Sequence, residues 1–391
     1  MAALQHTNWN YPTTVWFGHQ RTADIVQACE QMGMVKPLIV TDEALVKLPI
    51  MQDLLRPLQE QSVPHIVYSN VQPNPTGENV EEGVALYREH GCDGVIAFGG
   101  GSALDAGKTI AFMSNQSLPL WRFEDIGDNW RRACIEGMAK TIAIPTTSGT
   151  GSEVGRAAVI TQGETHAKKI IFHPQMMPSL VILDPNLTYG LPKHITAWTG
   201  IDALVHALEA YLAPGFHPMA DGIAVEAITM IKEHLPVAYH EPHNEEARAH
   251  MLVAAMMGAT AFQKGLGSVH SLAHTLGGLY NMPHGLANSI ILPYALQQNG
   301  AEIREKIEKL CLLLDIENPS LESFLQYILD LRDTLGIPST LVEAKIPHER
   351  VSEVASIAYD DPSTGSNARA LKVKDFEALF TACCTGDFGL L

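Results

Sequence analysis

The segment VIAFGGGSALDAGK, residues 95–108, combines an apolar strand, a glycine turn and the start of a helix. The apolar run is continuous over 94–98, as expected of a strand covered on both faces. The three glycines at 99–101 let the backbone turn tightly and approach a ligand closely. The following helix start presents free N–H groups, which suit a pyrophosphate. The run departs from GxGxxG at Leu104, so a tight turn that binds no ligand is the alternative.

Strand and helix patterns alternate on both sides of this segment. The strand candidates are 36–41, 64–69, 94–98, 140–145 and 179–184, and 157–161 with 168–172 could form a hairpin. Helical patterns lie between several of them, for example at 78–90 and 103–113. This alternation predicts an α/β domain with a parallel sheet.

The pattern changes after Pro192, where helix follows helix without a convincing strand. The predicted helices are 195–213, 218–235, 244–262, 267–279, 302–314, 319–336, 348–358 and 373–384. Turn-forming residues in DPNLTYGLP, near 185–192, mark the boundary. We therefore expect an α/β dinucleotide-binding domain over 1–188 and an all-helical metal-binding and catalytic domain over 189–391.

Composition narrows the function classes. The chain has 391 residues, of which 46% are hydrophobic and 18% charged, a globular balance. Its formal net charge of -17 repels phosphate backbones and anionic membrane surfaces. We find neither an apolar run of the roughly 20 residues that span a bilayer nor a signal-peptide pattern at the N-terminus. The six cysteines lack metal-ligand spacing, which favours reduced thiols in the cytoplasm.

Two further features join the glycine turn at strand ends. The loop PTTSGTGSE, 145–153, is rich in hydroxyls and glycine, and it directly follows a predicted strand. Ligands of open α/β sheets bind at the carboxyl ends of the strands, where this loop and the glycine turn should converge. Asp42 ends the strand LIVT and could accept hydrogen bonds from an adenosine ribose, although capping the next helix is an equal alternative.

The second half carries a candidate metal site. Asp202 and His206 are four residues apart on a helical pattern, and His270 and His274 repeat that spacing on another. Gly277 and Gly278 are expected to end the second helix, and His284 follows in a loop. Imidazole nitrogens and a carboxylate suit Zn²⁺ or Fe²⁺. Chance pairs are expected among 17 histidines, but Asp202 lies in an apolar run, where a buried charge needs a partner or a metal.

Taken together, these motifs resemble the iron-containing (group III) metal-dependent alcohol dehydrogenase family over nearly the whole chain. The strongest matches are FGGGSALDAGK, PTTSGTGSE, TGIDALVHALEAY and GSVHSLAHTLGGLYNMPHGLANSIILP. The resemblance implies a Rossmann-like α/β domain followed by an all-helical domain, the dehydroquinate synthase-like architecture. It also implies an enzyme that uses NAD and Fe²⁺ (or Zn²⁺).

The resemblance assigns roles to individual residues. The implied metal ligands are Asp202, His206, His270 and His284, and His274 is the implied proton-relay residue beside the nicotinamide. The implied dinucleotide contacts are Asp42, Asn74, Gly100, Gly101, Ser102, Asp105, Thr146, Thr147 and Lys168. Lys168 is uncertain by one position, because Lys169 is adjacent.

The implied reaction is oxidation of an alcohol to an aldehyde or ketone, and the reverse, with hydride transfer to NAD assisted by one divalent metal. A hydroxy-acid dehydrogenase, for example for 4-hydroxybutyrate, and a glycerol or diol dehydrogenase are alternatives. A dehydroquinate synthase-like lyase and a non-catalytic NAD-binding module are more distant ones. We expect a small alcohol or aldehyde substrate, a homo-oligomer (dimer or higher), and no nucleic-acid or membrane partner.

One stretch departs from the family pattern. AFQKGLGSVH, 261–270, is one residue shorter than is common there, and it contains Lys264 next to the pocket wall. Two interpretations are open: the ammonium points into the pocket and pairs with the carboxylate of a hydroxy acid, or it caps the preceding helix and faces water.

Overall fold

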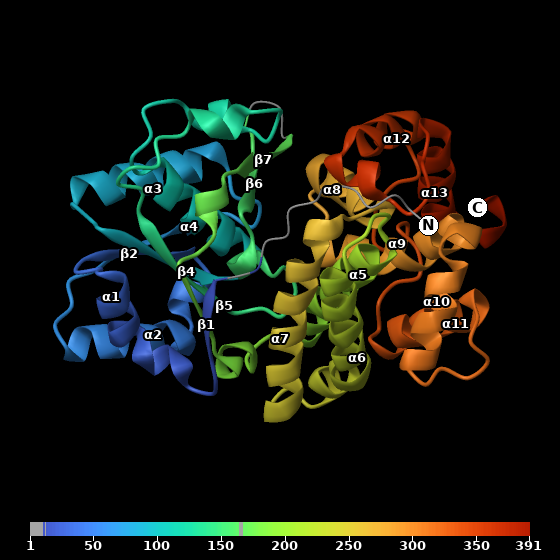
Figure 1. Cartoon of the computed structure of the whole chain (residues 1–391), viewed down its shortest axis with the longest axis horizontal. Helices are drawn as coiled ribbons and strands as arrows, with labels where there is room; N and C mark the ends of the chain where they lie inside the picture. The colour runs from blue at the N-terminus through green and yellow to red at the C-terminus, as the bar shows by residue number, and fades with distance from the viewer. Residues whose placement is uncertain (1–10, 12, 164–166) are drawn as a thin grey trace. The chain divides into compact units, whose positions relative to one another are not determined.

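The computed structural model describes residues 11, 13–163 and 167–391. These residues form two compact units, Tyr11–Gly190 and Leu191–Leu391. The first unit is built on strands and the second on helices (Figure 1).

Within the described residues, the first unit contains a six-stranded parallel sheet of order β1-β8-β5-β4-β2-β3 and a separate antiparallel β6–β7 hairpin. The strands are β1 (Thr14–Phe17), β2 (Pro37–Asp42), β3 (Ile66–Val71), β4 (Gly94–Gly99), β5 (Lys140–Pro145), β6 (Ala157–Thr161), β7 (Lys168–Phe172) and β8 (Leu180–Leu183). The α-helices of this unit are α1 (Ile25–Met32), α2 (Pro49–Glu60), α3 (Gly77–Glu89) and α4 (Gly101–Met113). The predicted parallel α/β domain is confirmed.

Helices cover both faces of the sheet. Side chains of α1 and α2 pack with Ile39 and Ile96, whereas side chains of α3 and α4 pack with Leu38 and Val95. Because consecutive residues of a strand point to opposite faces, both faces of β2 and β4 are apolar. This explains the uninterrupted apolar runs in the sequence. Burial on both sides leaves the strand ends as the part of the sheet that can reach a ligand.

The second unit is helical: residues 191–391, all of them described, contain no strand. Its α-helices are α5 (Lys193–Leu212), α6 (Pro218–His240), α7 (Glu245–Ala261), α8 (Ser268–Tyr280), α9 (His284–Asn299), α10 (Arg304–Leu313), α11 (Leu321–Thr334), α12 (Val351–Asp360) and α13 (Val373–Thr385). The predicted all-helical half is confirmed. Among the described residues, we find no helix with the length and apolarity that crossing a bilayer requires.

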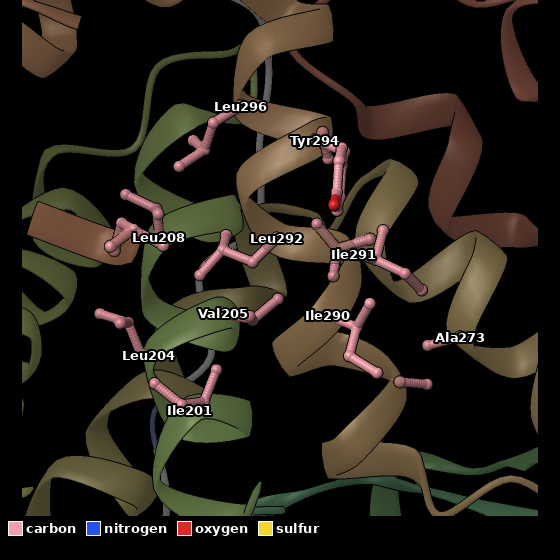
Figure 2. Packing of buried hydrophobic residues seen from close by; sticks show 14 of the residues in the cluster. Ile201, Leu204, Val205, Leu208, Ala273, Ile290, Ile291, Leu292, Tyr294 and Leu296 are labelled. Carbon is pink, nitrogen blue, oxygen red and sulfur yellow. The ribbon is translucent and has the colours of Figure 1, made fainter. Parts of the chain in front are cut away.

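The core of this unit surrounds α5. Its residues Ala203, Leu204 and Val205 are fully buried, and the buried cluster continues through α9. Figure 2 shows Val205 of α5 and Leu292 of α9 pointing into the space between these two helices. Close packing therefore fixes the positions of the polar side chains that α5 and α9 also carry.

Two local predictions are wrong. Helix α8 does not end at Gly277 and Gly278 but runs through both of them to Tyr280, because buried neighbours outweigh the low helix propensity of glycine. His284 is not in a loop: it is the first residue of α9, directly after Pro283. A proline is tolerated at 283, the residue before the helix, because an N–H group there would have no partner within the helix.

Candidate functional site

The glycine turn and the hydroxyl-rich loop meet at the carboxyl ends of β4 and β5. The N–H of Thr146 donates to the carbonyl of Gly99 at 3.0 Å. A Cβ placed on Gly101 would lie 2.7 Å from Cγ2 of Thr150, so any larger residue would force the loop or this side chain to shift. The first turn of α4 has no side-chain cap. Its N–H groups and the neighbouring threonine hydroxyls form a place suited to phosphate oxygens.

A third loop joins them. The hydroxyl of Ser102 donates to the carbonyl of Pro73, and Asn74 is the next residue along the chain. Thr147 lies beside the turn, with Cγ2 3.5 Å from a Cβ placed on Gly100. The structure thus brings together the residues that the sequence analysis assigned to this place from the three loops.

Asp42 caps the backbone that follows it, which was one of the two roles expected from the sequence. Its Oδ1 accepts the N–H groups of Ala44 and Leu45 at 3.0 and 2.8 Å. Its Oδ2 lies beside the glycine turn, 3.9 Å from a Cβ placed on Gly99. Capping uses one carboxylate oxygen, and the other is directed at the turn.

The carboxylate of Asp105 has hydrogen-bond and ion-pair partners within the protein. Its carboxylate accepts the N–H of Val159 at 2.9 Å, the hydroxyl of Ser152 and the ammonium of Lys108 at 3.1 Å. The side chain therefore fastens the hydroxyl-rich loop and β6 to α4. Of the two candidate lysines, Lys169 pairs with Glu124 at 2.8 Å. Lys168 is the one near Asp105, and burial lowers its pKa although the charge of Asp105 opposes this shift.

The four predicted metal ligands come together within the second unit. Asp202 and His206 lie one turn apart on α5, His270 lies on α8 and His284 begins α9. One donor atom from each residue lies within 4.8 Å of the other three. A Cβ on Gly285 would lie 2.5 Å from the Trp198 carbonyl, so only a glycine after His284 lets α9 approach α5 this closely.

The donor atoms suit a divalent metal. The Nε2 atoms of His206, His270 and His284 lie 4.0, 3.9 and 3.5 Å from Oδ1 of Asp202. Metal bonds of about 2.1 Å in tetrahedral geometry place donor atoms about 3.4 Å apart, close to this spacing. His270 Nε2 is buried and has no hydrogen-bond partner among the described residues. Such an atom is costly to bury unless a metal takes its lone pair.

The protonation of His270 favours metal binding. Burial, followed by the nearby His206, holds the pKa of His270 well below its ordinary value, although Asp202 opposes the shift. A neutral imidazole keeps a lone pair for a metal ion, whereas a protonated one has none. Together, three histidines and one carboxylate form a donor set typical of zinc or ferrous iron.

Two residues that were not predicted from the sequence contact the predicted ligands. Glu209 Oε2 lies 2.6 Å from Nδ1 of His270. Asn288, one turn after His284, donates from Nδ2 to Oδ1 of Asp202 at 2.5 Å. Burial raises the pKa of Glu209 to about 7, although hydrogen bonds from the N–H groups of residues 269 and 267 act to lower it. Glu209 had a signal in the sequence, because it continues the helical face of Asp202 and His206, whereas Asn288 had none, because His284 was expected in a loop.

His274 lies beside the ligands and has a partner of its own. Its ring stacks on that of His284, with centroids 5.3 Å apart. Its Nδ1 lies 2.9 Å from Oδ2 of Asp361. Burial raises the pKa of Asp361, but the hydrogen bond and charge of His274 outweigh this effect and leave the pKa below its ordinary value. Asp361 was not predicted, because the two residues are 87 positions apart.

Both interpretations of Lys264 are wrong. Its side chain is 2% exposed and forms an ion pair with Asp221, so it does not face water. The ammonium also donates to the carbonyl of Tyr211, at the C-terminal end of α5, at 3.1 Å. Cations are favoured at helix C-termini, and Asp221 supplies the opposite charge. Lys264 thus fastens the end of α5 and is not a cation held ready for a substrate.

The chain is similar to known proteins over most of its length. Residues 12–185 match a family model described as iron-containing alcohol dehydrogenase, and residues 196–384 match the C-terminal model of the same family. A 4-hydroxybutyrate dehydrogenase from Cupriavidus necator is 35% identical over 361 residues, which are 90% of this chain and 93% of that protein.

Solved structures give the same result. A 1,3-propanediol oxidoreductase aligns with a TM-score of 0.92 and 33% identity, covering 97% of this chain and 100% of the other. A sulfoacetaldehyde reductase from Bifidobacterium kashiwanohense, in complex with NAD⁺, aligns with a TM-score of 0.88 and 28% identity, covering 98% and 100%. The chain therefore belongs to the iron-containing alcohol dehydrogenase family, as predicted, and it is an alcohol oxidoreductase.

Proposed function

We propose that this protein oxidises a short primary alcohol to the aldehyde, with NAD⁺ as the hydride acceptor, and catalyses the reverse reduction. One divalent metal, Fe²⁺ or Zn²⁺, is held by Asp202, His206, His270 and His284. The observation that carries the proposal is the convergence of these four donor atoms within 4.8 Å. The three loops at the strand ends, with Asp42, support NAD as the dinucleotide.

The groups around the proposed metal site have separate roles in the reaction. When bound, the metal acts as a Lewis acid on the alcohol oxygen, and NAD⁺ takes the hydride. His274 donates its Nδ1–H to Asp361, which leaves the lone pair on Nε2 to accept the hydroxyl proton. The alcohol carbon loses a hydride, the oxygen loses a proton, and the products are aldehyde, NADH and one proton. Asp361 fixes the tautomer that this proton transfer needs.

The substrate is proposed only as a class. The relative from Cupriavidus necator is named for 4-hydroxybutyrate, and a 33% identical relative from Klebsiella pneumoniae is named a 1,3-propanediol dehydrogenase. Both compounds are short chains with a primary hydroxyl and a second polar group. A hydroxy acid is therefore the second candidate, but without Lys264 as its carboxylate partner.

The test is NADH formation by the metal-loaded protein with 1-butanol, 1,3-propanediol and 4-hydroxybutyrate. We expect turnover with at least one of them, and the ratios of kcat/KM identify the preferred second group. Failure to form NADH from any short primary alcohol, by protein that holds one metal per chain, would contradict the proposed activity.

Asp42 is expected to make NAD the preferred cofactor. Its Oδ2 lies beside the glycine turn, so the 2′-phosphate of NADP would come close to a carboxylate, and the two negative charges would repel each other. We expect Asp42→Gly to reduce the ratio of kcat/KM for NAD over NADP by about tenfold or more, which corresponds to about 1.4 kcal/mol. The measurement is the initial rate with each cofactor.

Asp93→Gly is the matched control for Asp42. Asp93 likewise accepts two backbone N–H groups, from Val35 and Lys36. It precedes β4, however, and therefore lies at the amino-terminal end of the strand, opposite to the glycine turn. Its replacement should leave the cofactor ratio unchanged. Equal kcat/KM for NAD and NADP in the unmodified protein would overturn the role of Asp42.

The proposal extends to location and assembly. The six cysteines are free, and all but Cys134 are buried, which supports a reducing compartment such as the cytoplasm. A homo-oligomer, a dimer or larger, is also proposed, and the molar mass in solution tests it.

A further inference from the structure

The carboxylate of Glu209 occupies an unusual position for a buried acid. It lies on α5 three residues after His206, so Asp202, His206 and Glu209 follow one face of the helix. Its side chain is 9% exposed. Oε2 contacts Nδ1 of His270 at 2.6 Å, and Oε1 accepts the N–H of Val269 at 2.9 Å. The side chain therefore caps the start of α8 and holds the ring of a metal ligand at the same time.

The backbone of α8 is adapted to this contact. A Cβ on Gly267 would lie 2.8 Å from Oε1 of Glu209 and 2.6 Å from Oδ1 of Asn367. A side chain at 267 would therefore force either the helix start or these two side chains to shift. The N–H of Ser268 is taken by Asn367 at 3.1 Å, so Glu209 is not needed to satisfy every N–H at this end. The specific task left to Oε2 is the contact with His270.

We propose that Glu209 is a positioning residue for the metal site: it accepts the Nδ1–H of His270 and so keeps the lone pair of that ring on Nε2, facing Asp202. The geometry supports this assignment, because Nε2 points to the Asp202 carboxylate at 3.9 Å on the opposite side of the ring. Carboxylates that hold a metal-binding histidine in this way orient the ring and make it a better ligand. The inference deepens the proposed function and rests on its metal site.

Glu209→Gln separates this role from helix capping. The amide oxygen can still accept the N–H of Val269, which turns the amide NH₂ toward Nδ1 of His270. The imidazole must then accept at Nδ1 and carry its proton on Nε2, where it blocks the metal. We expect the affinity of the metal-free protein for Zn²⁺, measured by chelator competition, to fall roughly 10- to 100-fold. The unfolding midpoint of the metal-free variant should stay close to that of the unmodified protein.

Glu153→Gln is the matched control. Glu153 is also buried, and burial raises its pKa to about 7 as it does for Glu209, but it lies in the first unit and is not part of the group of four converging donors. Its replacement should leave Zn²⁺ affinity unchanged. If Glu209→Gln does not fold, Glu209→Asp keeps the charge but draws the carboxylate back by one methylene, and a smaller loss of affinity is expected.

The possible results distinguish the role of Glu209 from the existence of the metal site. Zn²⁺ binding by Glu209→Gln, or by Glu209→Asp in its place, as tight as that of the unmodified protein would overturn the role of Glu209 and leave the metal site standing. A loss of stability without a loss of affinity would do the same, because it would make Glu209 a helix cap only. Failure of the unmodified protein to bind Zn²⁺ would instead contradict the proposed function itself.

Discussion

Replacing His270 with alanine is expected to remove the metal and with it nearly all alcohol oxidation. His270 supplies a buried Nε2 that has no hydrogen-bond partner among the described residues, and alanine leaves only three of the four donors, those of Asp202, His206 and His284. We expect metal affinity to fall by at least about 100-fold, since even the loss of an outer partner of a ligand costs roughly 10- to 100-fold. Metal content per chain and NADH formation are measured on the same preparation.

His250→Ala is the control for this variant. His250 lies on α7 in the same helical unit and stacks on His234, with centroids 4.0 Å apart, but it is not one of the four ligands. Its replacement should change neither metal content nor turnover. If His270→Ala keeps its full metal content, the assignment of the ligands is wrong.

Replacing His274 with alanine should give a different pattern, in which turnover is lost and the metal is retained. His274 is held by Asp361 and stacks on His284, but it is not among the four residues whose donor atoms converge. Loss of a general acid–base group lowers kcat by about 10²- to 10⁴-fold. We therefore expect one metal per chain together with a decrease in kcat of that order.

Asp361→Asn tests the same relay from its other end. The amide can donate to Nδ1 of His274 and move the ring proton to Nε2, so kcat should fall while metal content stays at one. Loss of metal in His274→Ala would make His274 a ligand. Unchanged kcat in that variant would remove it from the reaction.

The sequence was most informative where the pattern was local. The strand, glycine turn and helix over 95–108 appear as β4 and α4, because continuous apolar runs and glycines have few other interpretations. The spacing of Asp202 and His206 likewise gave one helix face. Glu209 continues that face but was overlooked, since an acid on a helix is usually exposed and only the contact with His270 reveals its position.

Other elements could not be predicted from local patterns. Strand β1 has four residues at the edge of the sheet, and α9 contains Pro293, which argues against a helix. Packing of α9 against α5 outweighs that penalty. The pairing of His274 with Asp361, and of Lys264 with Asp221, joins residues 87 and 43 positions apart. Such contacts depend on the tertiary fold, which the local pattern of apolar and polar residues does not reveal.

We propose that alcohol oxidation by this protein requires one divalent metal, held by Asp202, His206, His270 and His284. The most direct measurement is to strip the protein with a chelator, return Fe²⁺ or Zn²⁺ in small steps, and follow NADH formation from a short primary alcohol. We expect turnover to be lost on stripping and to rise to a plateau at one metal per chain. Full turnover by the metal-free protein would contradict it.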